Sequence, residues 1–220
     1  MSKIKPRVIE TEEGIQSDFT VAEYDKMQRH LRDRGWTEIK SIITSGINYG
    51  LALEIGPGPG YLGLEWLKRT SDTSLKCVEI SNAMIHIANR NAREYNLVDR
   101  VEYKEGRAEN IPFDDSMFDA VFSNGSLHEW SNPIHVFSEI HRVLKIEGKF
   151  LVSDLKRNMH PFMVWFLKFN TKPKTIRPGL ISSINAAYTR EEIIDIIGKT
   201  QFTNTAVTEN MLGIDIKGTK

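Results

Sequence analysis

Cysteine is almost missing from this chain of 220 residues, because Cys77 stands alone. One thiol excludes an internal disulfide framework and suits a reducing compartment. Cys77 lies in an apolar run, which favours an inert buried thiol. No apolar run approaches the ~18 residues that cross a bilayer, and the start, MSKIKPRVIETEEG, lacks the apolar core of a signal peptide. We therefore expect a cytoplasmic protein without a transmembrane segment.

An excess of one charge is also missing, since 29 lysines and arginines balance 29 aspartates and glutamates. The general electrostatic case for nucleic acid is therefore absent, and nucleic acid is not an expected partner. The six histidines are scattered, and the chain contains neither an H-x-x-x-H nor a C-x-x-C pair. We therefore expect no metal site.

Charge is uneven in one place, between Leu155 and Arg190, where seven basic residues occur without an acidic one. The same segment contains the apolar run MHPFMVWFLKF. Four interpretations stay open: a cover for an apolar or anionic substrate, a surface for an anionic membrane, a homodimer contact, or a solvated basic loop over an ordinary core helix.

Apolar runs that suit strands alternate with segments of helical periodicity along the chain. The predicted strands are 51–56, 74–81, 100–106, 118–125 and 149–155, and the predicted helices are 20–35, 37–45, 60–70, 82–96, 132–148 and 189–200. Two final runs, FTNTAVT and MLGIDIKG, resemble strands joined by a tight turn. This order predicts an α/β fold with a doubly wound, mostly parallel sheet, helices on both faces and a C-terminal antiparallel β-ribbon.

The stretch LALEIGPGPGYLG, residues 51–63, places a glycine-rich loop directly after the first predicted strand. Gly56, Gly58 and Gly60 remove side chains, so that a ligand can lie against the backbone. The following helix directs its first N–H groups at the same space. In an open parallel sheet, ligands bind outside the carboxyl ends of the strands. The loop is therefore predicted to bind a ligand closely.

The choice of ligand depends on two carboxylates near this loop. Residues 58–63 fit the dinucleotide pattern G-x-G-x-x-G, which is a weak signal by itself. Glu54, however, would repel a pyrophosphate and favour a ligand with a cationic end, such as S-adenosylmethionine. Glu79, nineteen residues after Gly60, ends the second predicted strand. It is placed either to accept the hydroxyl groups of a ribose or to cap the next helix.

Five segments in this order, LALEIGPGPGYLG, CVEIS, GRAENIPF, FDAVFSNGSLHEW and HRVLKIEGKFLVSD, resemble the class I S-adenosylmethionine-dependent methyltransferases. The likeness is greatest to the small-molecule branch that includes the ubiquinone/menaquinone-biosynthesis type, and it covers about residues 50–155. It implies a Rossmann-like fold, S-adenosylmethionine as cofactor, and methyl transfer to a small-molecule acceptor by in-line displacement.

The resemblance also implies roles for individual residues. Glu54, the backbone of Gly56, Gly58 and Gly60, and Asn124 would hold the methionine end; Glu79 would hold the ribose; Ile80, Met84 and Ala108 would contact the adenine. The family commonly has an aspartate where this chain has Arg107, which offers no acceptor. The adenine amino group is therefore left to Glu109, a backbone carbonyl or water.

The acceptor side is predicted to lie at the segment SLHEWSNP, which follows the fourth predicted strand. His128 is a candidate for a general base, a substrate ligand or a residue that orients the loop, and Glu129 is a second catalytic candidate. Trp130 could cap the pocket or staple the next helix, and we favour the staple. Residues 1–48 are expected to form a helical lid, and residues 49–220 the cofactor-binding domain, with a substrate-side insertion at about 156–188.

Two other functions stay open at this point. One is an NAD(P)-dependent oxidoreductase on a similar sheet, which Glu54 disfavours. The other is a protein that binds the cofactor without turnover, which the intact acidic and glycine positions disfavour. A homodimer is possible, and the identity of the methyl acceptor does not follow from the residues, because fold does not settle function.

Overall fold

The structure, a computed structural model, describes residues 5–10 and 18–220. Its seven strands are β1 (Gly50–Ile55), β2 (Thr73–Glu79), β3 (Val101–Glu105), β4 (Phe118–Asn124), β5 (Leu144–Leu155), β6 (Asn204–Glu209) and β7 (Gly213–Thr219). The helices are α1 (Asp18–Asp33), α2 (Ile39–Thr44), α3 (Tyr61–Arg69), α4 (Asn82–Glu94), α5 (Pro133–Val143), α6 (Pro161–Asn170), α7 (Arg177–Ala186) and α8 (Arg190–Ile197). Two short 3-10 turns are η1 (Leu127–Glu129) and η2 (Lys174–Ile176).

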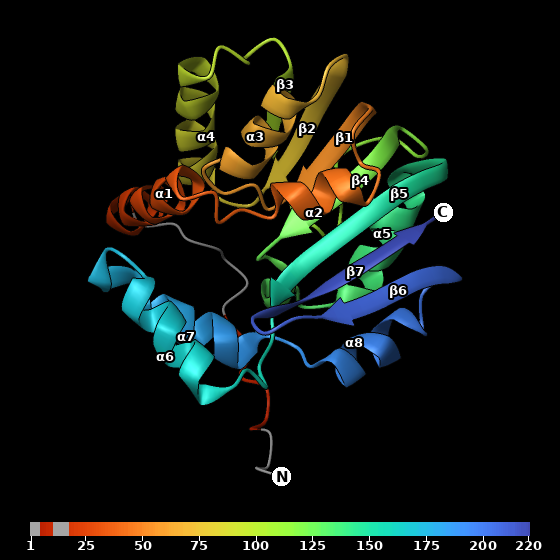
Figure 1. The fold of residues 1–220 in the computed structure, drawn as a ribbon. Coiled ribbons are helices and arrows are strands. Elements are labelled where there is room, and N and C mark those ends of the chain that lie inside the picture. The colour runs from red at the N-terminus through yellow and green to blue at the C-terminus, as the bar shows by residue number, and fades with distance from the viewer. Residues whose placement is uncertain (1–4, 11–17) are drawn as a thin grey trace.

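All seven strands form one sheet in the order β3-β2-β1-β4-β5-β7-β6 (Figure 1). The first five strands of that order are parallel, and β7 runs antiparallel to both β5 and β6. The predicted doubly wound sheet with its C-terminal ribbon is thus confirmed. The chain leaves β1 toward β2 on one side and returns to β4 on the other, so the switch point lies at the carboxyl ends of β1 and β4.

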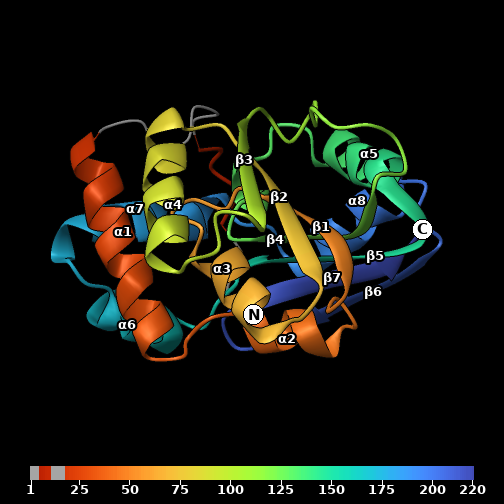
Figure 2. The same cartoon turned by 90° about the horizontal axis from the view of Figure 1, so that it is seen from above.

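Alternate residues of the central strands belong to two apolar layers, one on each face of the sheet. Ala52 of β1 and Phe122 of β4 pack with Trp66 of α3 and with α2. Leu53 and Val121, their neighbours on the same strands, pack with α5 and α8 on the other face. Figure 2 shows α2 and α3 on the opposite side of the sheet from α5 and α8. Helices on both faces explain why these strands are almost wholly apolar.

Several predicted boundaries are wrong by two residues or more. The first helix begins at Asp18, two residues earlier than expected. The helix predicted over 132–148 ends at Val143, where β5 begins. Leu144 already pairs with Phe118, and the register with β4 shifts before Lys149 pairs with Ala120. Pairing with β4 therefore overrides the helical periodicity of this segment.

Two parts of the chain outside the sheet meet over its carboxyl edge (Figure 1). Residues 156–188 contain α6, η2 and α7, and α1 precedes the sheet in sequence. The hydroxyl of Thr175 in η2 donates to Glu23 Oε2 of α1 at 2.8 Å. Every helix among residues 5–10 and 18–220 is too short or too polar to cross a bilayer.

Gly63 allows α3 to lie close against β1 and β2. A Cβ atom at this position would lie 2.3 Å from Oε2 of Glu54 and 2.4 Å from Cδ2 of Leu75. Contacts this short force the helix or both side chains to move. The fourth glycine of the loop sequence therefore serves helix–sheet packing.

We expect Gly63→Ala to lower the free energy of unfolding by about 1–3 kcal/mol, because the added methyl group overpacks this contact. Urea denaturation measures the change. Gly179→Ala is the matched control, since a Cβ atom there meets nothing within 4 Å and alanine favours the helix by about 0.5–1 kcal/mol. Equal stability of Gly63→Ala and the wild type would contradict the tight contact.

Candidate functional site

The glycine loop between β1 and α3 has the conformation that glycine alone adopts easily. The backbone φ angles of Gly56, Gly58 and Gly60 are +66°, +52° and +82°, in the left-handed region. A Cβ atom on Gly56 would lie 2.8 Å from the side chain of Ser126, and one on Gly60 would lie 2.6 Å from the hydroxyl of Tyr103. Gly60 thus faces β3 and serves packing as well as the turn.

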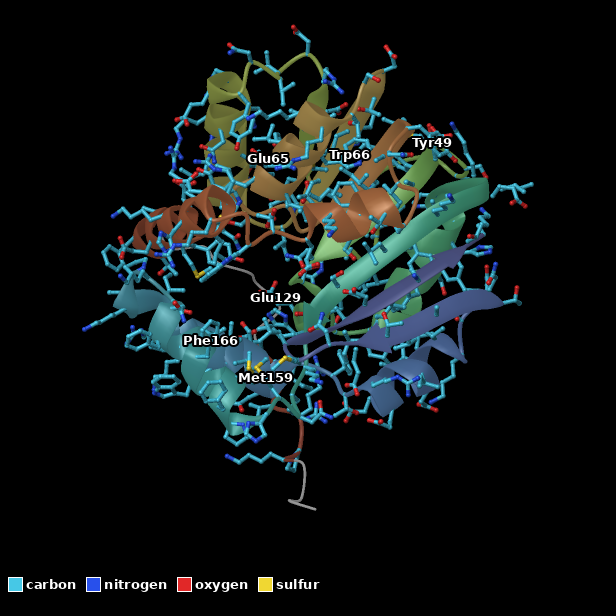
Figure 3. The ribbon with its side chains drawn as sticks, in the orientation of Figure 1. Tyr49, Glu65, Trp66, Glu129, Met159 and Phe166 are labelled. Atoms are coloured by element: carbon cyan, nitrogen blue, oxygen red, sulfur yellow. The ribbon has the colours of Figure 1, made fainter. Side chains whose placement is uncertain are left out.

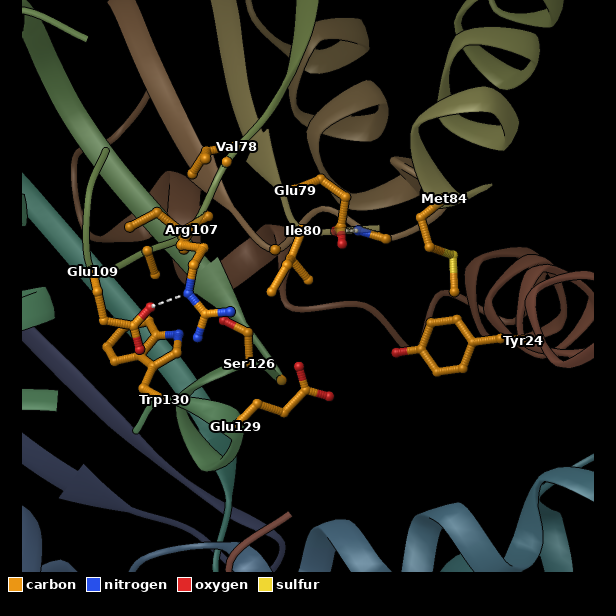
Figure 4. A pocket seen from close by; sticks show the side chains of 16 residues that line it. Tyr24, Val78, Glu79, Ile80, Met84, Arg107, Glu109, Ser126, Glu129 and Trp130 are labelled. Atoms are coloured by element: carbon orange, nitrogen blue, oxygen red, sulfur yellow. Dashed lines mark hydrogen bonds and ion pairs between the residues drawn. The ribbon is translucent and has the colours of Figure 1, made fainter. Parts of the chain in front are cut away.

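A cavity, which we call the loop cavity, lies between this loop and the ends of β2 and β4 (Figure 4). It brings together eight of the residues predicted for the site: Gly56, Gly58, Glu79, Ile80, Met84, Ala108, Glu109 and Glu129. A smaller cavity of about 50 Å³ adjoins it and contains the predicted Glu54 and Asn124. The two cavities share Tyr24, Gly56, Gly58 and Gly125. They therefore form one continuous site with two ends.

Glu79 is fixed at the end of β2 by backbone donors. Its Oε2 accepts the N–H of Gly58 at 3.0 Å, and its Oε1 accepts the N–H of Ser81 at 3.0 Å. Burial raises the pKa of Glu79, and these hydrogen bonds oppose that rise. The carboxylate therefore connects the glycine loop to the start of α4 while lining the loop cavity.

Glu54 is 2% exposed and lies beneath the loop, at the smaller cavity. Its carboxyl group accepts from Gly63 N–H and lies 3.9 Å from the Cys77 thiol. Burial, together with repulsion from Glu79, raises the pKa of Glu54 to about 8. Cys77 is fully buried, as predicted, and burial also raises its pKa.

Arg107 and Glu109, the two residues considered for the adenine amino group, lie close together at the loop cavity. Arg107 Nε lies 3.7 Å from Glu109 Oε2 (Figure 4). Glu109 Oε1 also accepts from the hydroxyl of Ser131 at 2.9 Å. Trp130 closes the same cavity and meets Phe137 of α5 edge-on, with ring centroids 5.7 Å apart. The predicted staple of Trp130 on the next helix is thus confirmed.

A larger cavity of about 400 Å³, which we call the α1–α7 cavity, lies on the other side of Glu129. Apolar side chains from α1, from the α1–α2 connection and from residues 155–180 form much of its wall: Met27, Leu31, Trp36, Leu155, Leu167, Ile176 and Leu180. Tyr24, Gly125 and Glu129 line both this cavity and the loop cavity. His30 also lines this cavity, whereas Phe19 of the same helix is 66% exposed.

His128 lies at the floor of the α1–α7 cavity between two carboxylates. Its Nδ1 is 2.9 Å from Asp154 Oδ2, and its Nε2 is 3.3 Å from Glu10 Oε2. Burial alone would lower the pKa of His128, but the charge and hydrogen bonds of Asp154 and Glu10 raise it to about 10. An imidazolium with both nitrogens engaged has no free site for another proton at neutral pH. This geometry favours orientation of the loop over a role as base.

Glu129 extends into the space between the sheet edge and α6–α7 (Figure 3). Burial raises its pKa, His128 opposes the rise, and repulsion from Glu10, Glu79 and Asp154 adds to it, which places the pKa at about 7. The side chain is 36% exposed, so a molecule in either cavity can reach it.

Glu10, His128 and Glu129 offer ligand atoms within 4.8 Å of one another. No local sequence pattern indicates this group, because Glu10 and His128 are 118 residues apart. The protonated His128 already pairs with the carboxylates on both sides, and an imidazolium repels a metal ion. We therefore assign no metal to the cluster.

Sequence reasoning missed Glu10 and Asp154, the two partners of His128. Asp154, like Glu79, stands at the carboxyl end of a predicted strand, where ligands of a parallel sheet bind. The position of Asp154 in the predicted strand 149–155 is therefore a signal that could have identified it. Glu10 carries no comparable signal, because its contact depends on how the N-terminal segment crosses the sheet edge.

These features define a class: an α/β protein with a nucleoside-type site at its switch point and a separate apolar cavity beside it. Residues 53–152 match a family model described as a methyltransferase domain. Over all of this chain and 97% of the other, the fold matches a solved S-adenosyl-L-methionine-dependent methyltransferase of Methanococcus maripaludis, with a TM-score of 0.74 and 24% identity.

Two curated relatives each match about half of the chain. The ubiquinone/menaquinone biosynthesis C-methyltransferase UbiE of Blochmanniella pennsylvanica is 30% identical over 105 residues, which is 47% of this chain and 41% of that protein. The uncharacterized methyltransferase YdaC of Bacillus subtilis is 31% identical over 118 residues, which is 54% of this chain and 61% of that protein. The matches thus span about half the length of these relatives.

Residues 53–152 are therefore similar to a methyltransferase domain, and the chain has the fold of solved S-adenosylmethionine-dependent methyltransferases. The resemblance seen in the sequence implies S-adenosylmethionine as the cofactor. The described residues fit that group, because the buried carboxylates of Glu54 and Glu79 flank the bare backbone of the glycine loop, which suits a ligand with a cationic end and ribose hydroxyl groups.

We expect the affinity for S-adenosylmethionine to rise between about pH 6.5 and about pH 8.5, because the sulfonium cofactor favours the ionised form of Glu54. Below the raised pKa of about 8, ionisation must accompany binding, which costs up to about tenfold in affinity per pH unit. Calorimetric titration at both pH values measures this slope. Glu54→Gln should weaken binding at high pH and remove the part of the slope that Glu54 contributes.

Glu65→Gln is the matched control, because Glu65 of α3 is also buried but accepts from Arg69 and Tyr95 and lines neither the loop cavity nor the smaller one, so the change should leave the pH dependence of the affinity as it is. A second readout is stability without cofactor. The folded pKa of Glu54 lies above its unfolded value, so the wild type loses stability as pH rises from about 4.5 to about 8. Glu54→Gln should lose less stability over that pH range. If the affinity for S-adenosylmethionine depended on pH equally in the wild type and in Glu54→Gln, Glu54 would have no role in binding the cofactor.

Proposed function

We propose that the protein transfers a methyl group from S-adenosylmethionine to a small, largely apolar acceptor held in the α1–α7 cavity. The proposal rests on one observation, that the two cavities have lining residues in common. Tyr24, Gly125 and Glu129 line both the α1–α7 cavity and the loop cavity. A donor in one cavity and an acceptor in the other would meet at these three residues, as displacement at a methyl carbon requires.

In this proposal the donor lies along the continuous site beside the glycine loop. Glu79 accepts the ribose hydroxyls, Ile80 and Met84 pack on the adenine, Ala108 and Glu109 contact its edge, and Glu54 and Asn124 hold the methionine end. The placement is supported by the division of these residues between the loop cavity and the smaller one. A dinucleotide fits less well, because its diphosphate would lie at the glycine loop, next to the buried carboxyl group of Glu54.

The chemistry needs little from the protein beyond alignment. The acceptor's nucleophilic atom bonds to the methyl carbon as the carbon–sulfur bond breaks and the sulfur takes the electron pair. If the acceptor carries a proton at that atom, Glu129 is the group we propose to receive it, since its pKa of about 7 suits a base near neutral pH. His128 is then a positioning residue, whose ion pairs with Asp154 and Glu10 fix η1 and thus Glu129.

The α1–α7 cavity supports an uncharged acceptor more than an anionic one. Its walls are largely apolar, while Glu10, Glu129 and Asp154 line the end that faces the loop cavity. An anionic group at that end would be repelled. Residues 1–48 and the insertion at 156–188 are the cover of this cavity in our proposal, since α1 and α7 both contribute to its wall.

Binding of the cofactor is the direct test. We expect S-adenosylmethionine and its demethylated product to raise the thermal midpoint by an amount that follows ligand concentration, and NADH and NADPH to leave it unchanged.

Glu79→Ala should weaken cofactor binding by about tenfold to a hundredfold, because it removes a charge-assisted hydrogen-bond acceptor. Stabilisation by NADH or NADPH alone would point to the oxidoreductase. Tight cofactor binding without methyl transfer to any extract component would point to a non-catalytic binding protein.

Once an acceptor is found by screening extracts with labelled methyl donor, Glu129→Gln tests the base. We expect kcat to rise with pH through about 7 in the wild type, and Glu129→Gln to lower kcat by about 10²–10⁴ and to remove that rise. Glu109→Gln is the control, because it lines only the donor side and should change KM for the cofactor while retaining the pH profile. An unchanged profile in Glu129→Gln would exclude the base role.

A further inference from the structure

Helix α6 is an unusual surface helix, because its outward face is aromatic. Phe162 and Trp165 are each 58% exposed, Phe169 is 64% exposed and Phe166 is 36% exposed. Every residue of this ten-residue helix is at least partly exposed. Figure 3 labels Phe166 on this helix. An apolar cluster of this kind on a protein surface marks an interaction site.

The aromatic rings form an ordered stack rather than isolated exposed side chains. The Trp165 ring lies between those of Phe162 and Phe169, with centroid separations of 5.8 and 5.6 Å and interplanar angles of 29° and 19°. Leu167, by contrast, lines the α1–α7 cavity. The helix therefore presents one apolar face to the cavity and a second, continuous apolar face outward.

The charges around this face identify the partner. Lys168, Lys172 and Lys174 are exposed within or directly after the helix. From Leu155 to Arg190 the chain contains no acidic residue. Aromatic side chains flanked by lysine are the composition that places a helix in the interface of an anionic bilayer. Two copies of this chain joined through the same face would instead bring their lysines together.

We propose that the outward face of α6 inserts into the surface of membranes that contain anionic lipid. Phe162, Trp165 and Phe169 enter the boundary between headgroups and acyl chains, and the lysines contact lipid phosphates. Because the opposite face of α6 belongs to the wall of the α1–α7 cavity, this orientation places the cavity next to the lipid. The surface goes beyond the proposed methyl transfer, and its test uses neither cofactor nor acceptor.

Cosedimentation with vesicles tests the proposal on the full chain. We expect binding to phosphatidylcholine vesicles that contain about one third phosphatidylglycerol, and much weaker binding to phosphatidylcholine alone. Trp165→Ala combined with Phe169→Ala should lower the partition coefficient about tenfold or more, because two interfacial rings are lost. Lys168→Glu should lower binding to the anionic vesicles about fivefold or more.

Ile146→Ala is the matched control, since Ile146 is 80% exposed but lies at the far end of β5 from residue 155. It should bind vesicles as the wild type does. Urea denaturation of all variants verifies that each is folded. Three outcomes would overturn the proposal: no binding to anionic vesicles, undiminished binding by the double variant, or a concentration-dependent dimer without lipid that the double variant abolishes.

Discussion

The structure depends on carboxylates buried at the carboxyl ends of the parallel strands. Glu54, Glu79 and Asp154 stand at the ends of β1, β2 and β5, and each is less than a tenth exposed. Burying a carboxylate is costly unless donors or a positive charge compensate it. Backbone N–H groups compensate Glu79, and protonated His128 compensates Asp154. Glu54 has the least compensation, which is why its pKa rises to about 8 and a cationic ligand suits this edge.

The sheet and the helices outside it form different cavities. The loop cavity, where we propose that the donor binds, consists of strand ends and short loops, which the parallel sheet positions at its switch point. The α1–α7 cavity, where we propose that the acceptor binds, is lined largely by α1 and by residues 156–188, which lie outside the sheet. A scaffold of this kind accepts many substrates through changes in such additions. The aromatic face of α6 and much of the wall of the α1–α7 cavity accordingly belong to segments outside the sheet.

Most of the donor side was predictable, because its signals are local in sequence. The loop from Gly56 to Gly60 and the acid at Glu79 each occupy a fixed place in a strand–loop–helix unit, so their positions follow from a few adjacent residues. The surroundings of His128 were not predictable in this way. Its two partners come from β5 and from the N-terminal segment, and they convert a candidate base into a cation with a pKa of about 10.

The sequence by itself determined the order of strands and helices, the glycine loop and the residues available to bind a cationic nucleoside, since these depend on periodicity and on conformational preferences within one unit. Only the tertiary structure decided that Glu129 lies on the wall between two cavities and that α6 exposes its aromatic face. Exposure, the pKa values of buried groups and the shape of a cavity arise from contacts between segments far apart in the chain. The sequence pattern of one segment does not contain those contacts.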